Sequence, residues 1–254
     1  MLQKLPFFKK EIIRYTDCMK NATDFEMEKA LLEEGRSFVI GIDEAGRGPL
    51  AGPVVAAAVC YKQRDFAIPE HLEKEFLRIR DSKKLSPKQR EEISSFIEEH
   101  FYVGIGVASN EVIDRLNILQ ATFLAMKGAY TMLRKQLPRE ERTESVVLVD
   151  GNQLIPNVSF EQKAVVGGDG FVKSIAAASI MAKVAHDRFF ASFEEQYPGY
   201  GFGQHMGYGT KVHMDALRRL GPSPVHRMTF RPVELSIPEN ANRKFSRVLR
   251  PRRP

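Results

Sequence analysis

Residues 40–53 read IGIDEAGRGPLAGP, and the rest of the chain is interpreted outward from this stretch. The apolar residues Phe38 to Ile40 predict a buried strand. That strand delivers two adjacent carboxylates, Asp43 and Glu44, into a glycine-rich turn. Neighbouring strand residues point to opposite faces of a sheet, so both acids can serve one site only if the chain already turns at Glu44.

The loop after the acids places Arg47 between Gly46 and Gly48. Glycine lets the backbone approach a ligand closely, and a planar guanidinium matches a phosphate. Carboxylates beside such a loop indicate a metal ion and a phosphate in the same place. On composition alone, an ordinary strand end with a solvated acidic turn explains the stretch equally well.

Length and composition describe an ordinary globular protein. The 254 residues can bury a full core, with 43% hydrophobic and 28% charged residues. A net charge of +6 favours a polyanionic partner, although part of the excess lies in residues 243–253. Cys18 and Cys60 lack metal-ligand spacing and indicate a reduced compartment. No secretory or membrane-spanning apolar run is present, so we expect a cytoplasmic protein with no membrane partner.

The hydrophobic pattern predicts an α/β fold. Strands are expected to begin at five positions, namely Ser37, Gly52, Phe101, Ser145 and Lys163, the first two forming a hairpin. Helices are expected after the Ser86 cap, along 119–137 and along 172–197. This predicts a five-stranded mixed sheet flanked by helices, with a C-terminal helical segment. The expected division is an N-terminal appendage (1–36), a catalytic domain (37–235) and a basic, disordered tail (236–254).

Two more carboxylates stand at informative positions. Asp150 ends the continuous apolar run from Ser145, as expected at the carboxyl edge of a central parallel strand. Asp187 lies four residues after Lys183 in the alanine-rich helix, so it forms either an exposed salt bridge or an inward-pointing ligand. Converging carboxylates without histidine or cysteine suit Mg²⁺ or Mn²⁺ and two-metal phosphoryl chemistry, which leaves a 3'-hydroxyl and a 5'-phosphate.

Three other features have competing interpretations. Lys83 and Lys84, taken alone, fit a solvated turn better than a phosphate contact. Tyr208, in a loop of glycine and aromatic residues, fits stacking on a base or sugar as well as ordinary packing. Residues 3–8 faintly resemble the peptides that dock on sliding clamps, but an N-terminal strand or packing contact explains them better.

Five motifs in this order resemble bacterial type 2 ribonuclease H (ribonuclease HII): DEAGRGPLAGPV, DSKKLS, VDG, KVAHD and GYGT. The resemblance covers about residues 38–232. It implies the ribonuclease H-like fold and an endonuclease that uses two Mg²⁺ or Mn²⁺ ions. It also implies cleavage of the RNA strand of RNA/DNA hybrids and nicking 5' of single ribonucleotides embedded in duplex DNA.

The same resemblance implies roles for individual residues. The metal-binding carboxylates would be Asp43, Glu44, Asp150 and Asp187. The residues in contact with nucleic acid would be Gly46, Arg47 and Gly48, which read the 2'-hydroxyl; Tyr208, which stacks on the neighbouring sugar; Lys83 and Lys84, which contact phosphate or backbone; and Lys183, an active-site neighbour. His186 departs from the family, which usually has arginine there, and would supply a phosphate contact weakly and in a pH-dependent way.

Two alternatives accompany this interpretation. A hybrid-binding module that has lost catalysis would fit the basic charge and His186, but none of the four acids is lost. A nuclease that attacks only longer RNA stretches, as type 3 ribonucleases H do, is disfavoured by Tyr208 and by the form DEAGRGP. We expect a monomer.

Overall fold

A mixed sheet of six strands forms the centre of the protein in a computed structural model, which describes residues 11–14, 23–139 and 144–237. The strands are β1 (Glu11–Arg14), β2 (Phe38–Ala45), β3 (Val54–Tyr61), β4 (Phe101–Ala108), β5 (Ser145–Asp150) and β6 (Glu161–Val166), in the order β1-β6-β5-β2-β3-β4. β2, β3 and β4 pair antiparallel, whereas β1, β6, β5 and β2 run parallel. The predicted hairpin is therefore confirmed.

The sixth strand, β1, was not among the five predicted from the sequence. It lies in the predicted N-terminal appendage and pairs parallel with β6, Ile12 opposite Ala164. Four residues are too few to show a strand period, and their partner is distant in the chain, so local pattern could not reveal them. Residues 3–8 and the tail from residue 238 lie outside the described residues.

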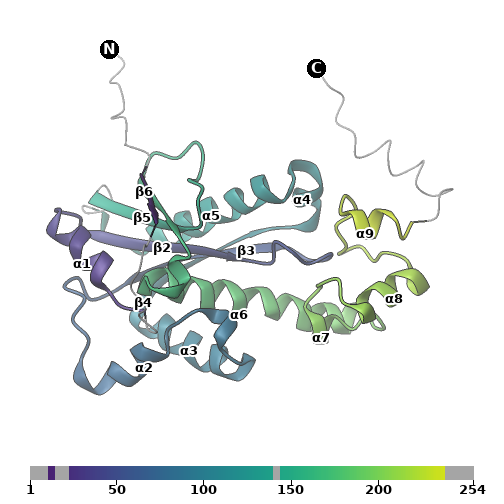
Figure 1. The fold of residues 1–254 in the computed structure, drawn as a ribbon, viewed down its shortest axis with the longest axis horizontal. Coiled ribbons are helices and arrows are strands. Elements are labelled where there is room, and N and C mark those ends of the chain that lie inside the picture. The colour runs from purple at the N-terminus through teal and green to yellow at the C-terminus, as the bar shows by residue number, and fades with distance from the viewer. Residues whose placement is uncertain (1–10, 15–22, 140–143, 238–254) are drawn as a thin grey trace, which may run out of the picture.

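Helices cover both faces of the sheet (Figure 1). They are α1 (Glu26–Glu33), α2 (Glu73–Arg78), α3 (Pro87–His100), α4 (Asn110–Leu116), α5 (Ile118–Arg134), α6 (Lys173–Gln196), α7 (Phe202–His205), α8 (Lys211–Leu220) and α9 (Arg231–Glu234). The predicted cap of α3 is confirmed, because Ser86 and Gln89 form a capping box. None of these helices, in the part of the chain that the structure describes, is both long and apolar enough to cross a membrane.

Glycines in the strands bring the two long helices close to the sheet. A Cβ atom at Gly41 of β2 would collide with the α6 backbone at Ser174 and Ile175. A Cβ atom at Gly106 of β4 would likewise collide with the α5 backbone at Ala125. α6 therefore lies directly against the strand that carries Asp43.

The N-terminal helix α1 packs on the body of the protein. Phe25 and Leu31 are buried in the same core cluster as α6 residues. The buried Glu28 accepts a 2.8 Å hydrogen bond from the backbone N–H of Ser174, in the first turn of α6. Burial raises the pKa of Glu28 to about 7. Described residues of the predicted appendage thus anchor α6, while the boundary at residue 36 stays a prediction.

The C-terminal helices α7, α8 and α9 gather at one end of the molecule, where α6 runs beyond the sheet (Figure 1). Their core cluster contains Phe202, Leu217 and Val233, together with Phe190 of α6. Leu50 and Ala51, from the loop between β2 and β3, belong to the same cluster. The glycine-rich loop is therefore held between the sheet and the C-terminal helices.

A buried histidine pair lies within this C-terminal part. His213 and His226 are both completely buried, with 2.9 Å between their Nε2 atoms. The N–H of Ser223 donates to Nδ1 of His226, so the neutral His226 carries its proton on Nε2 and donates it to His213. Burial, followed by the nearby His213, lowers the pKa of His226 to about 3. Both rings are therefore held in the uncharged form.

This pair should make stability depend on pH. The folded pKa of His226 lies below the unfolded value of 6.5, so the contribution is complete above about pH 6.5 and is lost as pH falls towards about 3. At about pH 5 the part already lost amounts to about 2 kcal/mol. We expect wild type to lose more unfolding free energy than His226→Gln between about pH 7.5 and 5, measured by urea denaturation. The exposed control His71→Gln should behave as wild type; equal losses in wild type and His226→Gln would contradict the prediction.

Candidate active site

Two of the predicted carboxylates meet at the carboxyl edge of adjacent parallel strands. β2 and β5 are in register up to the pair Ile42 and Val149, and Asp43 and Asp150 are the next residues of the two strands. Asp43 is only 6% exposed. The sequence prediction applied the rule for parallel strands to Asp150, and the register brings Asp43 to the same edge.

The expected turn at Glu44 is not observed. β2 continues to Ala45, which still pairs with Val55 of β3, and the backbone turns only at Gly46, where φ is +89°. The antiparallel pairing with β3 is the reason, because it extends the strand past both acids. Glu44 nevertheless reaches Asp150, since the two line one pocket of about 130 Å³ beside α5.

A fourth carboxylate, Asp169, joins this edge from the short 3-10 helix η4 (Gly168–Gly170), which follows β6. Burial, Glu44 and Asp150 raise the pKa of Asp43 well above its ordinary value, and Asp169 adds to this. Burial, Asp169 and Glu44 raise the pKa of Asp150 to about 6. The four acids thus form a mutually repelling group, named here the acidic cluster: Asp43, Glu44, Asp150 and Asp169.

Asp169 was not among the ligands predicted from the sequence. The available signal was its place directly after a strand, between glycines, in the sequence Gly167 to Gly170. β6 is parallel to β5, so its carboxyl end reaches the same edge as Asp150.

The acidic cluster has the chemistry of a site for a hard divalent cation. Within residues 11–14, 23–139 and 144–237, no three His, Cys, Asp or Glu side chains are placed closely enough to coordinate one ion together. Oδ1 of Asp150 is buried and lacks a hydrogen-bond partner among the described residues. An orphaned carboxylate oxygen and like charges are both relieved by a cation, and an all-oxygen donor set suits Mg²⁺ or Mn²⁺. In donor type and in charge the acidic cluster therefore suits the predicted ions, although its side chains do not surround a single point.

Of the two lysines in the DSKKLS motif, Lys83 faces the acidic cluster. Its Nζ lies 3.1 Å from Oδ2 of Asp169, while its side chain remains 80% exposed. Partial burial lowers the pKa of Lys83, but the hydrogen bond to Asp169 and the neighbouring acids raise it more. Lys84 is exposed. Lys83 is thus placed beside the carboxylates.

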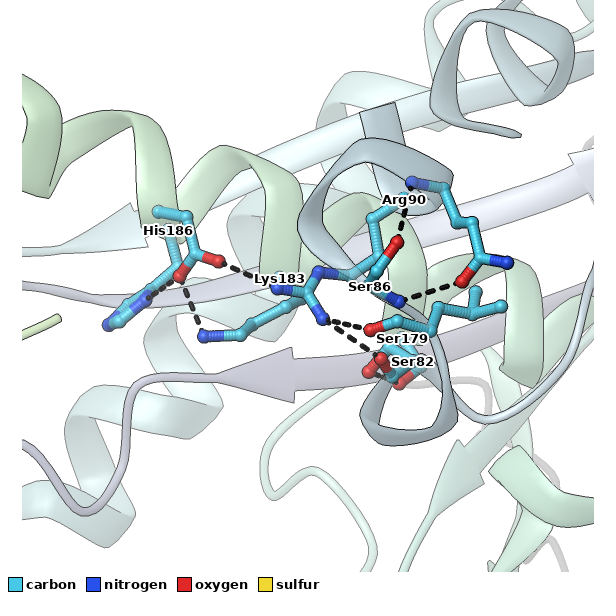
Figure 2. A network of polar contacts seen from close by, with 9 residues as sticks. Ser82, Ser86, Arg90, Ser179, Lys183 and His186 are labelled. Carbon is cyan, nitrogen blue, oxygen red and sulfur yellow. Dashed lines mark hydrogen bonds and ion pairs between the residues drawn. The ribbon is translucent and has the colours of Figure 1, made fainter. Parts of the chain in front are cut away.

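Asp187 takes part in a different network, part of which is shown in Figure 2. Its carboxylate lies 2.7 Å from Nζ of Lys183, 3.4 Å from Nη2 of Arg90 and 3.2 Å from Nδ1 of His186. Burial raises the pKa of Asp187, but the contacts with His186 and Lys183 outweigh it and lower the pKa. The contacts of Asp187 are thus with basic side chains of α3 and α6.

Arg90 and His186 connect this network to the DSKKLS motif and to the glycine-rich loop, respectively. Arg90 also donates to the backbone carbonyls of Ser82 and Leu85, which fixes the DSKKLS turn on α6. His186 is completely buried, and its ring lies so close to Gly46 that a Cβ atom there would collide with it. Its place under the loop gives His186 a packing role in this protein.

The glycine-rich loop and Tyr208 lie next to each other beside the acidic cluster. Nη1 of Arg47 is 3.1 Å from Oε1 of Glu44, which ties the loop to the carboxylates. A Cβ atom at Gly48 would be 3.3 Å from Cε1 of Tyr208, so the aromatic ring lies directly against this glycine. Tyr208 is 44% exposed. The sequence-predicted binding residues Gly48 and Tyr208 are therefore brought together on an accessible face.

Comparisons of the sequence with known proteins agree on one family. The sequence profile of Ribonuclease HII matches residues 40–233. Ribonuclease HII of Paramagnetospirillum magneticum is 49% identical over 205 residues, 80% of this chain and 95% of the relative. Ribonuclease HII of Caldicellulosiruptor bescii is 45% identical over 214 residues, which are 84% of this chain and 96% of the relative.

A solved structure shares the fold. The ribonuclease HII of Archaeoglobus fulgidus, determined in a complex with PCNA, is 25% identical, with a TM-score of 0.59 over 76% of this chain and 95% of that one. The predicted ribonuclease H-like fold is thus confirmed. The chain belongs to the ribonuclease HII family and is a ribonuclease H, an endonuclease that hydrolyses phosphodiester bonds.

Proposed function

We propose that the protein cleaves the RNA strand of RNA/DNA hybrids and nicks duplex DNA on the 5' side of a single embedded ribonucleotide, by a two-metal-ion mechanism. The observation that carries the proposal is the position of the acidic cluster beside the glycine-rich loop and Tyr208. Such an arrangement joins a cation site to a surface that can detect one ribose.

The acidic cluster would hold Mg²⁺ or Mn²⁺. When bound, two such ions activate a water molecule and stabilise the leaving oxygen, which yields 3'-hydroxyl and 5'-phosphate ends. Asp43 would supply a buried carboxylate and Asp150 a half-buried one from neighbouring strands, and Asp169 would complete the edge from η4. The sequence predicted Asp187 as the fourth ligand, and the carboxylate of Asp187 contacts Lys183, Arg90 and His186.

The surrounding residues would position the substrate. The backbone of Gly46, Arg47 and Gly48 would contact the ribose 2'-hydroxyl, because glycine allows a close approach. Tyr208 would stack on the neighbouring sugar. Lys83 and Lys84 would contact phosphates, and Lys183 would act through the Asp187 network.

The direct experiment uses end-labelled duplex DNA with one ribonucleotide, incubated with Mg²⁺ and in parallel with Mn²⁺, beside a continuous RNA/DNA hybrid. A cut immediately 5' of the ribonucleotide with a 3'-hydroxyl end supports the proposal. Cleavage only within the continuous hybrid would assign the protein to nucleases that need longer RNA. Binding without cleavage of either substrate would assign it to binding modules.

Tyr208 provides a test of the recognition surface. Tyr208→Ala should lower kcat/KM for the single-ribonucleotide duplex by about 10-fold or more, because stacking on one base or sugar contributes about 1–3 kcal/mol. The kcat/KM for a continuous hybrid should fall less, because its further riboses make additional contacts with the protein. Tyr208→Phe, which keeps the ring, serves as the control. Equal losses on both substrates would refute the role.

We further propose that the protein is a cytoplasmic monomer that can dock on a sliding clamp. The complex of the Archaeoglobus fulgidus relative with PCNA supports clamp docking. The candidate segment, residues 3–8, lies outside the described residues. Deletion of residues 1–10 should abolish retention on an immobilised clamp without changing the turnover of short duplexes; unchanged retention would exclude the segment.

A further inference from the structure

Arg227 is a completely buried arginine whose guanidinium reaches back to the glycine-rich loop. Its Nε donates to the carbonyl of Gly52 at 2.9 Å, and its Nη1 donates to that of Arg47 at 3.0 Å. Its Nη2 donates to the carbonyls of Gly46, at 2.5 Å, and Pro53, at 3.0 Å. All four acceptors lie between residues 46 and 53, so one side chain closes both ends of the loop.

Only arginine offers this set of donors. A guanidinium is a planar fork with five N–H groups, whereas lysine has one rotatable ammonium group. A charge without hydrogen bonds is costly to bury, so a completely buried arginine is stable only where several acceptors meet it. The carbonyls of the loop provide these acceptors, and the guanidinium in turn fixes their directions.

Backbone contacts join the middle of the loop to the same segment. The N–H of Arg227 donates to the carbonyl of Leu50 at 2.9 Å, and the N–H of Gly52 donates to the carbonyl of Val225 at 2.8 Å. On its other side, the N–H of Leu50 donates to the carbonyl of Gly207 at 2.7 Å, directly before Tyr208. The loop is therefore held between residues 225–227 and the residue that precedes Tyr208.

His226, the neighbour of Arg227, reaches Tyr208 through the histidine pair. Nε2–H of His226 donates to Nε2 of His213 at 2.9 Å, which leaves the proton of the neutral His213 on Nδ1. That Nδ1–H donates to the backbone carbonyl of Tyr208 at 2.9 Å. A continuous chain of hydrogen bonds thus runs from residue 226 to the backbone of Tyr208.

We infer that His226 and Arg227 are positioning residues that fix Gly46, Arg47 and Gly48 relative to Tyr208, and thereby set the preference for a single embedded ribonucleotide. The inference rests on the proposed function. A lone ribonucleotide offers one ribose to the loop and one neighbouring sugar to Tyr208, so both contacts must form together. A continuous hybrid offers further riboses and tolerates a displaced loop better. The acidic cluster lies on the strands and η4, outside this segment.

The test compares Arg227→Lys with the control Val233→Ala, measuring kcat/KM on the single-ribonucleotide duplex and on a continuous hybrid. Val233 is completely buried in the C-terminal core cluster, so its truncation weakens the same region without removing a hydrogen bond to the loop. If Arg227 had a structural role alone, its substitution would lower only the fraction of folded enzyme. The kcat/KM values for both substrates would then fall by the same factor, and their ratio would stay unchanged.

We expect Arg227→Lys to lower the ratio of single-ribonucleotide to hybrid cleavage by about 10-fold or more, because small displacements of positioning groups have effects of this size. Val233→Ala should leave the ratio unchanged at a similar loss of Tm. Hydrogen exchange should rise at residues 46–53 in Arg227→Lys alone.

An unchanged ratio in a folded Arg227→Lys would overturn the inference. If that variant does not fold, the same ratio is measured for His226→Gln. An unchanged ratio in His226→Gln would likewise overturn the inference. Failure of the wild-type protein to cut the single-ribonucleotide duplex would instead refute the proposed function itself.

Discussion

Asp43→Asn is expected to reduce kcat by at least about 10³-fold while substrate binding persists. Asp43 lies near the end of β2, where burial, followed by Glu44 and Asp150, raises its pKa. An amide keeps the size of the side chain but removes the negative charge that would hold a divalent ion. The loop, Tyr208 and Lys83 do not depend on this charge, so affinity for the duplex should change little. Single-turnover cleavage and gel-shift titration measure the two quantities separately.

The same variant should be more stable than wild type without metal. Replacing one carboxylate of the acidic cluster removes repulsion from its neighbours, as expected where function requires strained electrostatics. Mn²⁺ should raise the Tm of wild type more than that of Asp43→Asn, because binding to the folded state stabilises it. Asp215→Asn, which changes an exposed acid paired with Arg218 on α8, is the matched control and should resemble wild type. Full turnover by Asp43→Asn would refute the assignment of Asp43 to the metal site.

The second large effect is expected for Asp169→Asn, and it distinguishes Asp169 from Asp187 as the fourth metal ligand. Asp169→Asn should lose at least about 10³-fold in kcat and most of the Mn²⁺-dependent rise in Tm, because Asp169 acts electrostatically on both Asp43 and Asp150. The substitution also removes the charged partner of Lys83. Metal titration monitored by Tm reports on the site independently of turnover.

Asp187→Asn should act mainly on stability. It leaves Lys183 and Arg90 with a weakened partner in a half-buried network, at a cost of about 1–2 kcal/mol. Its response to Mn²⁺ should remain close to that of wild type, and its kcat should exceed that of Asp169→Asn. The reverse pattern, with the Mn²⁺ response lost in Asp187→Asn and kept in Asp169→Asn, would make Asp187 the fourth ligand.

Local sequence pattern determined five of the six strands of the described sheet and the place of two acids. Val39 and Ile40 begin a run with the composition of a buried strand, and Val146 to Val149 form another. Because parallel strands present their carboxyl ends at one edge, Asp43 and Asp150 could be assigned to one place before any contact was known. The Ser86 cap of α3 was equally local, since its hydrogen bonds span three residues.

Tertiary structure alone decided which other groups meet these acids. A strand followed by Gly167 to Gly170 does not show that Asp169 turns towards Asp150, nor does helical spacing show that Asp187 faces Lys183 and Arg90. Arg227 is separated by about 180 residues from the loop carbonyls that it binds. Periodicity records which face of an element is apolar, but contacts between distant segments depend on how the elements pack, and that packing exists only in the folded chain.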